Sequence, residues 1–275
     1  MSQHLKIDGI EILIEGEGAE TIIMMHGWPD TYRLWDAQVA ALKDRYRCVR
    51  FTLPGFDINK PRRMYSLDAV QRLLLYIVRK VAGEQKVILM LHDWGCVFGY
   101  QFYMRNKQLV SAIIGVDVGD APSKALDRSR SLGQRMMAGW YQGTLAMAWK
   151  IGGPLGNAMT RMMANTLKAP SPREHVGSCM NYPYYINWVG EEGSYASMLP
   201  FSPQCPMLFI YGTDKPLMFH SPQWSEALAG RKGCKVIAMA TDHWPMVRQP
   251  AAFNKAVEMW LESPANTPVQ DEEAA

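Results

Sequence analysis

Residues 86–104 constrain the fold most, because they join a buried strand to a helix through a single sharp turn. The short apolar run at residues 86–91 is typical of a fully buried strand. Residues 95–104 have the character of a helix, with Gly95 and Gly99 about one turn apart on one face. Asp93 lies at the turn between the two elements. The chain therefore contains at least one strand–turn–helix unit that presents a carboxylate at the end of a strand.

The same alternation of apolar strands and helices continues along most of the chain. A hairpin with Asp8-Gly9 at its turn is expected in residues 5–14, and Ser66 is expected to cap a long amphipathic helix that ends at Gly83. Further strands are predicted at residues 21–25, 46–51, 110–116, 206–211 and 235–239, and further helices at 33–42, 223–228 and 251–261. This pattern predicts an α/β fold with a mostly parallel sheet flanked by helices on both faces.

Residues 121–199 interrupt this alternation. They contain no convincing buried strand and are rich in Met, Trp, Tyr, Gly and Pro. We expect an inserted helical cap at 121–199, a core formed by residues 1–120 and 200–262, and a flexible tail at 263–275.

Charge and cysteine content exclude several classes of partner. The 29 basic and 26 acidic residues give a net charge of +3, which is too balanced for nucleic acid as a main partner. No apolar run approaches membrane length, and no leader-like segment opens the chain. The five cysteines have no metal-type spacing, so we expect a cytoplasmic protein without a metal or other cofactor. Its oligomeric state, monomer or homodimer, stays open.

The strand ends collect the groups that carry chemistry. Reactive groups in open parallel sheets gather at the carboxyl ends of the strands. Those ends carry a His-Gly-Trp-Pro motif at residues 26–29, then Asp93, Asp117, Asp214 and His243. The order is nucleophile, acid and histidine.

This set of motifs resembles the α/β-hydrolase fold, in the branch that contains epoxide hydrolases and haloalkane dehalogenases. The core resemblance covers roughly residues 20–120 and 200–262. It implies that Asp93 is the nucleophile and His243 the base. The backbone N–H groups of Trp28 and Trp94 would form an oxyanion hole, with His26 of the same motif as a further oxyanion or substrate-binding residue. Asp214 is the preferred acid partner of His243 because it follows the penultimate strand, and Asp117 is the alternative.

An aspartate nucleophile limits the chemistry. A carboxylate is ionised near neutral pH and can attack without a base. Attack on an acyl carbon would give a high-energy anhydride, whereas attack on a saturated carbon gives a stable ester. The substrate should therefore carry an epoxide oxygen or a halide, and His243 would activate the water that cleaves the ester.

Two tyrosines favour the epoxide. Epoxide hydrolases resembling this chain place two cap tyrosines over the nucleophile. Tyr141 matches the context of the first, and Tyr184 is chosen for the second, with Tyr182 and Tyr185 left open. The aromatic Trp28 also resembles epoxide hydrolases, since haloalkane dehalogenases commonly have an amide there. Hydrolysis of a small hydrophobic epoxide by water is the first prediction; dehalogenation of haloalkanes or haloacids, or a non-catalytic ligand-binding fold, are the alternatives.

The turn departs from the resemblance at one position. Leu91 stands two residues before Asp93, where a glycine or other small residue usually relieves crowding. Either the turn tilts or a small neighbour across it makes room.

Overall fold

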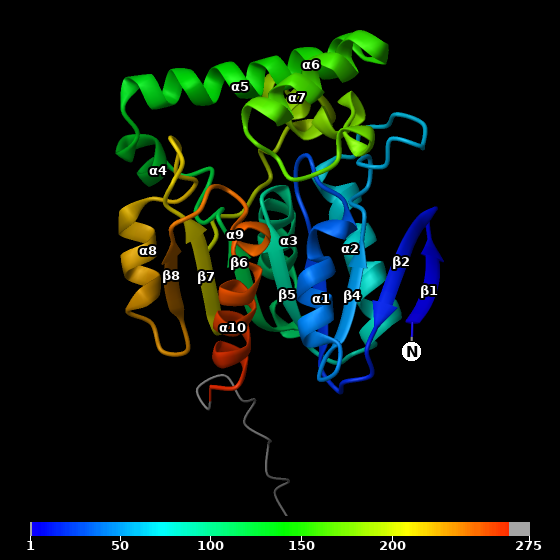
Figure 1. The fold of residues 1–275 in the computed structure, drawn as a ribbon, viewed down its shortest axis with the longest axis vertical. Helices are drawn as coiled ribbons and strands as arrows, with labels where there is room; N and C mark the ends of the chain where they lie inside the picture. The colour runs from blue at the N-terminus through cyan, green and yellow to red at the C-terminus, as the bar shows by residue number, and fades with distance from the viewer. Residues whose placement is uncertain (1, 264–275) are drawn as a thin grey trace, which may run out of the picture.

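The computed structural model describes residues 2–263, and an eight-stranded sheet forms its centre (Figure 1). The order across the sheet is β1-β2-β4-β3-β5-β6-β7-β8. The strands are β1 (Ser2–Ile7), β2 (Ile10–Glu15), β3 (Thr21–Met25), β4 (Arg47–Phe51), β5 (Val87–His92), β6 (Val110–Val116), β7 (Met207–Gly212) and β8 (Lys235–Met239). Pairing is parallel from β4 to β8, whereas β2 is antiparallel to β1 and β4. The predicted fold class is confirmed. Apart from Ser263, the tail expected at 263–275 lies outside the described residues.

Successive side chains along the strands point to opposite faces of the sheet and pack into two separate hydrophobic cores. Ile22 and Met24 of β3 pack on one face, beneath α1 (Asp36–Leu42), α9 (Pro245–Arg248) and α10 (Pro250–Leu261). Ile23 and Met25 pack on the other, beneath α2 (Leu67–Ala82), α3 (Trp94–Arg105) and α8 (Pro222–Ala229). This period of two is what a strand buried on both faces requires.

The longest core helix forms as its caps predict. The Ser66 hydroxyl accepts a hydrogen bond from the Ala69 N–H at the start of α2, and Gly83 ends the helix with a positive φ of 60°. A buried stripe of leucine, isoleucine and valine side chains then holds α2 on the sheet.

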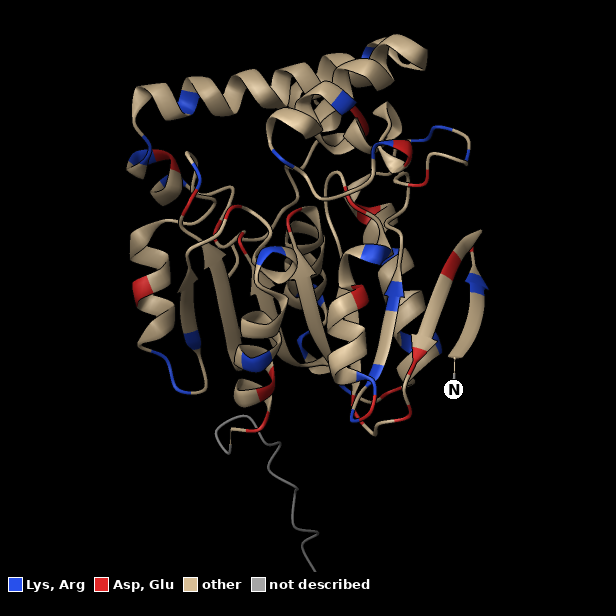
Figure 2. Cartoon of the chain, in the orientation of Figure 1, with Lys and Arg blue, Asp and Glu red and all other residues tan. Residues whose placement is uncertain are grey.

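The segment between β6 and β7 is helical and lies over the carboxyl ends of the strands (Figure 1). It contains α4 (Lys124–Ser129), α5 (Leu132–Ile151), α6 (Gly153–Thr166) and α7 (Tyr182–Val189). Figure 2 shows that α5 and α6 carry few charges along their length. None of the helices within residues 2–263 combines the length and the apolarity needed to cross a bilayer. The helical layer covers the edge of the sheet where the predicted reactive groups lie, and its status as a separate cap domain remains a prediction.

Candidate active site

Asp93 occupies a strained turn between β5 and α3. Its φ is 52°, in the region that non-glycine residues rarely adopt. Strain of this kind persists only where the surrounding structure enforces it, and it is concentrated at functional sites. This backbone conformation places the Asp93 carboxylate just beyond the carboxyl end of β5, where the sequence predicts it.

Gly27 allows the loop after β3 to lie directly against Asp93. A Cβ atom at Gly27 would be 2.3 Å from Asp93 Oδ1 and 2.5 Å from the Trp94 backbone nitrogen. The absence of a side chain therefore lets the backbone of the following residue reach the carboxylate. The Trp28 N–H donates a hydrogen bond of 2.6 Å to Asp93 Oδ1.

The crowding expected from Leu91 is absorbed by Gly99. A Cβ atom at Gly99 would lie 2.6 and 2.7 Å from the two methyl carbons of Leu91. The bulk missing from α3 is thus the space that the Leu91 side chain fills. Of the two outcomes predicted for this position, room made by a small neighbour is the one observed.

The acid that faces His243 is Asp117, and the preference for Asp214 is corrected. His243 Nδ1 donates a hydrogen bond to Asp117 Oδ2, and His243 Nε2 lies 3.5 Å from Asp93 Oδ2. Asp117 directly follows β6 and has a φ of 67°. His243 therefore bridges the two carboxylates through its two ring nitrogens.

Asp214 is exposed and does not contact His243. Its backbone N–H bonds to the carbonyl of Thr241, and its carboxylate accepts a hydrogen bond from the Thr213 hydroxyl at 3.1 Å. The loop after β7 is thus hydrogen-bonded to the loop that carries His243, and the Asp214 side chain is exposed to solvent. Asp214 and His243 both line the larger cavity described below, but no ion pair between them is found in the described part of the chain.

Lys215 holds the other oxygen of Asp117. Its ammonium lies 2.7 Å from Asp117 Oδ1, with a side chain that is 7% exposed. The Gly212 N–H donates to the same oxygen at 2.9 Å. Three donors, counting His243, therefore fix the orientation of this buried carboxylate. No motif in the sequence predicts this role of Lys215.

Mutual charge shifts the pKa values of the three central groups. Burial alone would lower the pKa of His243, but Asp117 and Asp93 raise it to about 9. Burial would likewise raise the pKa values of Asp93 and Asp117, but His243 holds both below their usual range. Near neutral pH, Asp93 is therefore ionised and available as a nucleophile.

Two tyrosines face the same space as Asp93. Tyr141 of α5 and Tyr184 of α7 are buried, with ring centroids 6.1 Å apart, and Tyr184 packs edge-on against Trp28 and Trp94. Burial raises the pKa of Tyr141 to about 12 and that of Tyr184 well above its usual value. Both hydroxyls therefore remain protonated and can donate hydrogen bonds.

The other two candidates for the second tyrosine point elsewhere. Tyr182 is buried against Phe56 and Trp149, and its hydroxyl has no hydrogen-bond partner in the described part of the chain. The Tyr185 hydroxyl donates to Glu191 at 3.1 Å in an exposed region. Only Tyr184 of the three lines a cavity that contains Asp93.

Two cavities converge on Asp93, and they share Asp93, Tyr141, Tyr184 and Phe219. The larger has a volume of about 610 Å³ and is mostly apolar. It also contains His243, and its walls include Met137, Trp140, Leu167 and Leu217. The smaller has a volume of about 220 Å³ and includes Gln142, Asn187, Tyr195 and Arg130. The site can therefore accept groups on two sides of the carboxylate.

His26 is a buried structural residue, which corrects its predicted oxyanion or substrate-binding role. Its Nε2 accepts a hydrogen bond from the Leu53 N–H at 2.9 Å, and its Nδ1 donates to the Gly27 carbonyl at 2.9 Å. With both nitrogens bound to backbone, the ring braces the loop that carries Trp28 and lines neither cavity.

Asp30 is a further buried carboxylate near His243, and no motif in the sequence predicts it. Asp30 accepts hydrogen bonds from the Ser171 hydroxyl at 2.6 Å and from the Trp244 indole at 2.9 Å. Burial raises the pKa of Asp30 to about 6. Because Trp244 adjoins His243 and Ser171 belongs to the segment over the sheet, Asp30 ties both to the loop after β3.

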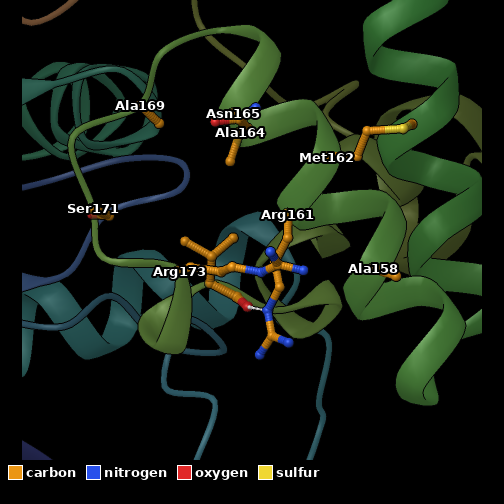
Figure 3. A pocket seen from close by; sticks show the side chains of 9 residues that line it. Ala158, Arg161, Met162, Ala164, Asn165, Ala169, Ser171 and Arg173 are labelled. Carbon is orange, nitrogen blue, oxygen red and sulfur yellow. Dashed lines mark hydrogen bonds between the residues drawn. The ribbon is translucent and has the colours of Figure 1, made fainter.

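A further cavity of about 490 Å³ lies on the α6 side and is unconnected with this chemistry (Figure 3). Arg161 and Arg173 line it, and Arg161 Nε donates to the Val176 carbonyl at 2.9 Å. Neither Asp93 nor His243 lines this cavity, so it lies outside the candidate active site.

Comparison with known proteins agrees with this architecture. A family model described as "Alpha/beta hydrolase family" matches residues 22–256. Epoxide hydrolase 1 of Caenorhabditis elegans is 24% identical over 147 residues, which are 51% of this chain and 34% of that relative. The alignment thus spans only about a third of the length of that curated relative.

Solved structures of low sequence identity share the fold. An epoxide hydrolase from Bacillus megaterium, in complex with an inhibitor, superposes with a TM-score of 0.71 and 17% identity, over 95% of this chain and 100% of that one. A haloalkane dehalogenase loop variant from Bradyrhizobium elkanii gives a TM-score of 0.66 and 17% identity, over 95% and 96%. The fold of this chain is therefore shared by an epoxide hydrolase and by a haloalkane dehalogenase.

Proposed function

Because the chain belongs to the alpha/beta hydrolase family, we propose that it hydrolyses epoxides to vicinal diols through an ester on Asp93. The observation that carries the proposal is the presence of Tyr141 and Tyr184 in the same cavity as Asp93 and His243. An epoxide oxygen that becomes an alkoxide needs acidic O–H donors, and two protonated hydroxyls would supply them.

In the first step, Asp93 Oδ2 would attack a ring carbon while the tyrosines donate to the ring oxygen. Asp93 Oδ1 already accepts the Trp28 N–H, which leaves Oδ2, the oxygen near His243, for the attack. The ring C–O bond breaks as the ester bond forms, and the alkoxide takes a proton from a tyrosine.

In the second step, ester formation would switch His243 from acid to base. The charge of Asp93 is one of the influences that raise the pKa of His243, and the ester no longer carries it. The pKa of His243 falls, and its proton passes through solvent to the tyrosinate left by the first step. The neutral imidazole can then deprotonate water while Asp117 stabilises the imidazolium that results. The resulting hydroxide attacks the ester carbonyl, and the Trp28 and Trp94 N–H groups would stabilise the oxyanion. The acyl C–O bond then breaks, the diol leaves with the proton of the new Asp93 carboxyl group, and Asp93 is again ionised.

The dehalogenase alternative finds less support in the same residues. A halide would need N–H donors in the cavity, and Trp28 lines the cavity that contains Asp93 and His243. Its Nε1 already donates to the Asn181 side chain at 2.7 Å. Binding a halide there would break a buried hydrogen bond, which costs about 1–3 kcal/mol.

The proposal is tested by trapping the ester. A His243→Gln variant should still be alkylated by styrene oxide but should not release the product, so protein mass should rise by the mass of one epoxide. Peptide mapping should place the adduct on Asp93. An adduct that forms only with a chlorinated alkane of similar size would favour dehalogenation. No adduct with either reagent, and no turnover by the wild type, would leave a ligand-binding fold.

Loss of the tyrosine hydroxyls should slow the first step. We expect Tyr141→Phe and Tyr184→Phe each to reduce kcat/KM for styrene oxide by about 10- to 1,000-fold, as for other lost oxyanion donors. Single-turnover kinetics should place the loss in ester formation. Tyr185→Phe is the matched control, because its hydroxyl contacts Glu191 outside the cavity. An equal loss in all three variants would contradict the assignment.

A further inference from the structure

The two cavities that meet at Asp93 differ in chemistry. The larger exposes mainly apolar surface, although Lys168 and Lys215 also line it, whereas polar and apolar surface are nearly equal in the smaller. Among the described residues that line the smaller cavity, Arg130 is the only basic one. A substrate bound across Asp93 would therefore place one substituent against apolar walls and the other toward a guanidinium.

The Arg130 guanidinium is incompletely satisfied. Its Nη2 donates to the Met218 carbonyl at 2.8 Å, and its Nε is buried with no hydrogen-bond partner. No carboxylate in residues 2–263 forms an ion pair with Arg130 within 4.0 Å, although Asp127 lines the same cavity from an exposed position. A partly buried guanidinium without a counter-charge is costly, and an anionic ligand would offset that cost.

Arg130 and Tyr141 line the same cavity, and they influence each other electrostatically. Burial raises the pKa of Tyr141, and the positive charge of Arg130 is among the influences that oppose it. Arg130 also lies over the Phe219 ring, with Cζ 5.8 Å from its centroid, and Phe219 borders both cavities. The guanidinium thus lines the same cavity as Tyr141 and Tyr184, the two tyrosines that would donate hydrogen bonds to the epoxide oxygen.

We propose that Arg130 binds a substrate carboxylate, so that the preferred epoxide carries an apolar substituent on one side of the ring and a carboxylate-bearing arm on the other. The inference rests on the proposed function and narrows its substrate class. The sequence predicts a small hydrophobic epoxide, and the inference adds a carboxylate to that substrate. A monoanion suits the site because Arg130 is a single cation near the ionised Asp93, and a guanidinium matches the planar geometry of a carboxylate.

The first test compares epoxy acids with their methyl esters. Each compound carries the same alkyl chain on one ring carbon, and the carboxylate is joined to the other by a spacer of increasing length. The wild type should prefer the acid at one spacer length. Arg130→Gln should raise KM for that acid about 10- to 100-fold while changing kcat and the ester far less. Arg130→Lys should restore part of the preference.

Arg128→Gln is the matched control, because Arg128 is exposed on α4 and lines neither cavity. It removes the same charge two residues before Arg130, from the last turn of α4, and should keep the preference for the acid. Equal use of acid and ester by the wild type at every spacer length, or a preference that survives in Arg130→Gln, would overturn the inference.

The second test separates this inference from the proposed function. Octanoate and octanamide are not epoxides, so their binding can be measured by calorimetry without any turnover. Octanoate should bind the wild type more tightly than octanamide, and Arg130→Gln should remove the difference. If that difference appears while no epoxide is hydrolysed, the carboxylate site stands and the proposed reaction fails. If octanoate binds the variant and the wild type equally, the carboxylate site fails even when epoxides are hydrolysed.

Discussion

Asp93→Asn is expected to reduce kcat/KM for epoxide hydrolysis by about four to six orders of magnitude, comparable to the loss of other covalent nucleophiles. An amide oxygen is a poor nucleophile, so ester formation should fail. Asparagine tolerates a positive φ well, and its oxygen can still accept the Trp28 N–H. The variant should therefore fold normally, and its loss of activity reports on the carboxylate alone.

The measurement is single-turnover kinetics on freshly prepared protein, with peptide mass analysis to exclude deamidation back to aspartate. Asp127→Asn serves as the matched control, because it is the same substitution at an exposed wall position of the smaller cavity. A normally folded Asp93→Asn variant that retains wild-type activity would rule out the covalent mechanism.

Asp117→Asn is expected to reduce kcat by about three to four orders of magnitude, while Asp214→Asn should change it less than about tenfold. Asp117 selects the tautomer of His243 and stabilises its charged form, whereas Asp214 points to solvent. Comparable losses in the two variants, or a larger loss at Asp214, would contradict the assignment.

Folding must be controlled in this comparison, because Asp117→Asn leaves the Lys215 ammonium buried without its carboxylate. Leaving a buried charge without its partner lowers the free energy of unfolding by about 3–5 kcal/mol. The double variant Asp117→Asn/Lys215→Met removes that cation and should regain thermal stability. Its activity should remain low, which separates the role of Asp117 toward His243 from its contribution to the fold.

The pH dependence gives a second measure of the same pair. The pKa of His243 is raised to about 9 in the folded protein from a usual 6.5. The folded state therefore binds more protons between those values, and the stability due to protonated His243 is complete below pH 6.5 and lost as the pH rises toward 9. The thermal midpoint of the wild type should fall across this interval. The fall should be smaller in the double variant, since the loss of Asp117 lowers the pKa of His243.

Most of the fold could be predicted because its strands are buried on both faces and are therefore continuous apolar runs. The bounds expected for β3, β6 and β8 agree with the structure residue for residue. The same argument located Asp93 and His243, since each follows a strand at its carboxyl end. Local sequence is informative where a single element determines the position of the side chain.

The choice between Asp117 and Asp214 could not be made in this way. Both residues follow neighbouring strands, and the difference lies in a positive φ at Asp117 and in the Lys215 ammonium that holds it. Neither feature has a sequence signature. The prediction from the usual position of the acid was wrong for that reason.

The cap tyrosine depended on the register of one short helix. Tyr182, Tyr184 and Tyr185 all lie on α7, and its helical rotation sends them in different directions. Only Tyr184 meets Trp28 and Trp94. The choice of Tyr184 agrees with this placement, although Pro183 gave no clear register from the sequence.

The position of the acid after β6 separates two tasks along the chain. Because the acid partner of His243 follows β6, the loop after β7 does not provide that carboxylate. Instead, Pro216, Leu217 and Phe219 of this loop line the larger cavity. Only Lys215 ties this loop to Asp117. Phe219 packs edge-on against His243, whereas Pro216 and Leu217 have no such contact with it in the described part of the chain. Substitutions at Pro216 and Leu217 would therefore change the wall of the larger cavity with little effect on the proposed catalytic residues, and these two positions are the ones to vary when a new substrate range is selected in the laboratory.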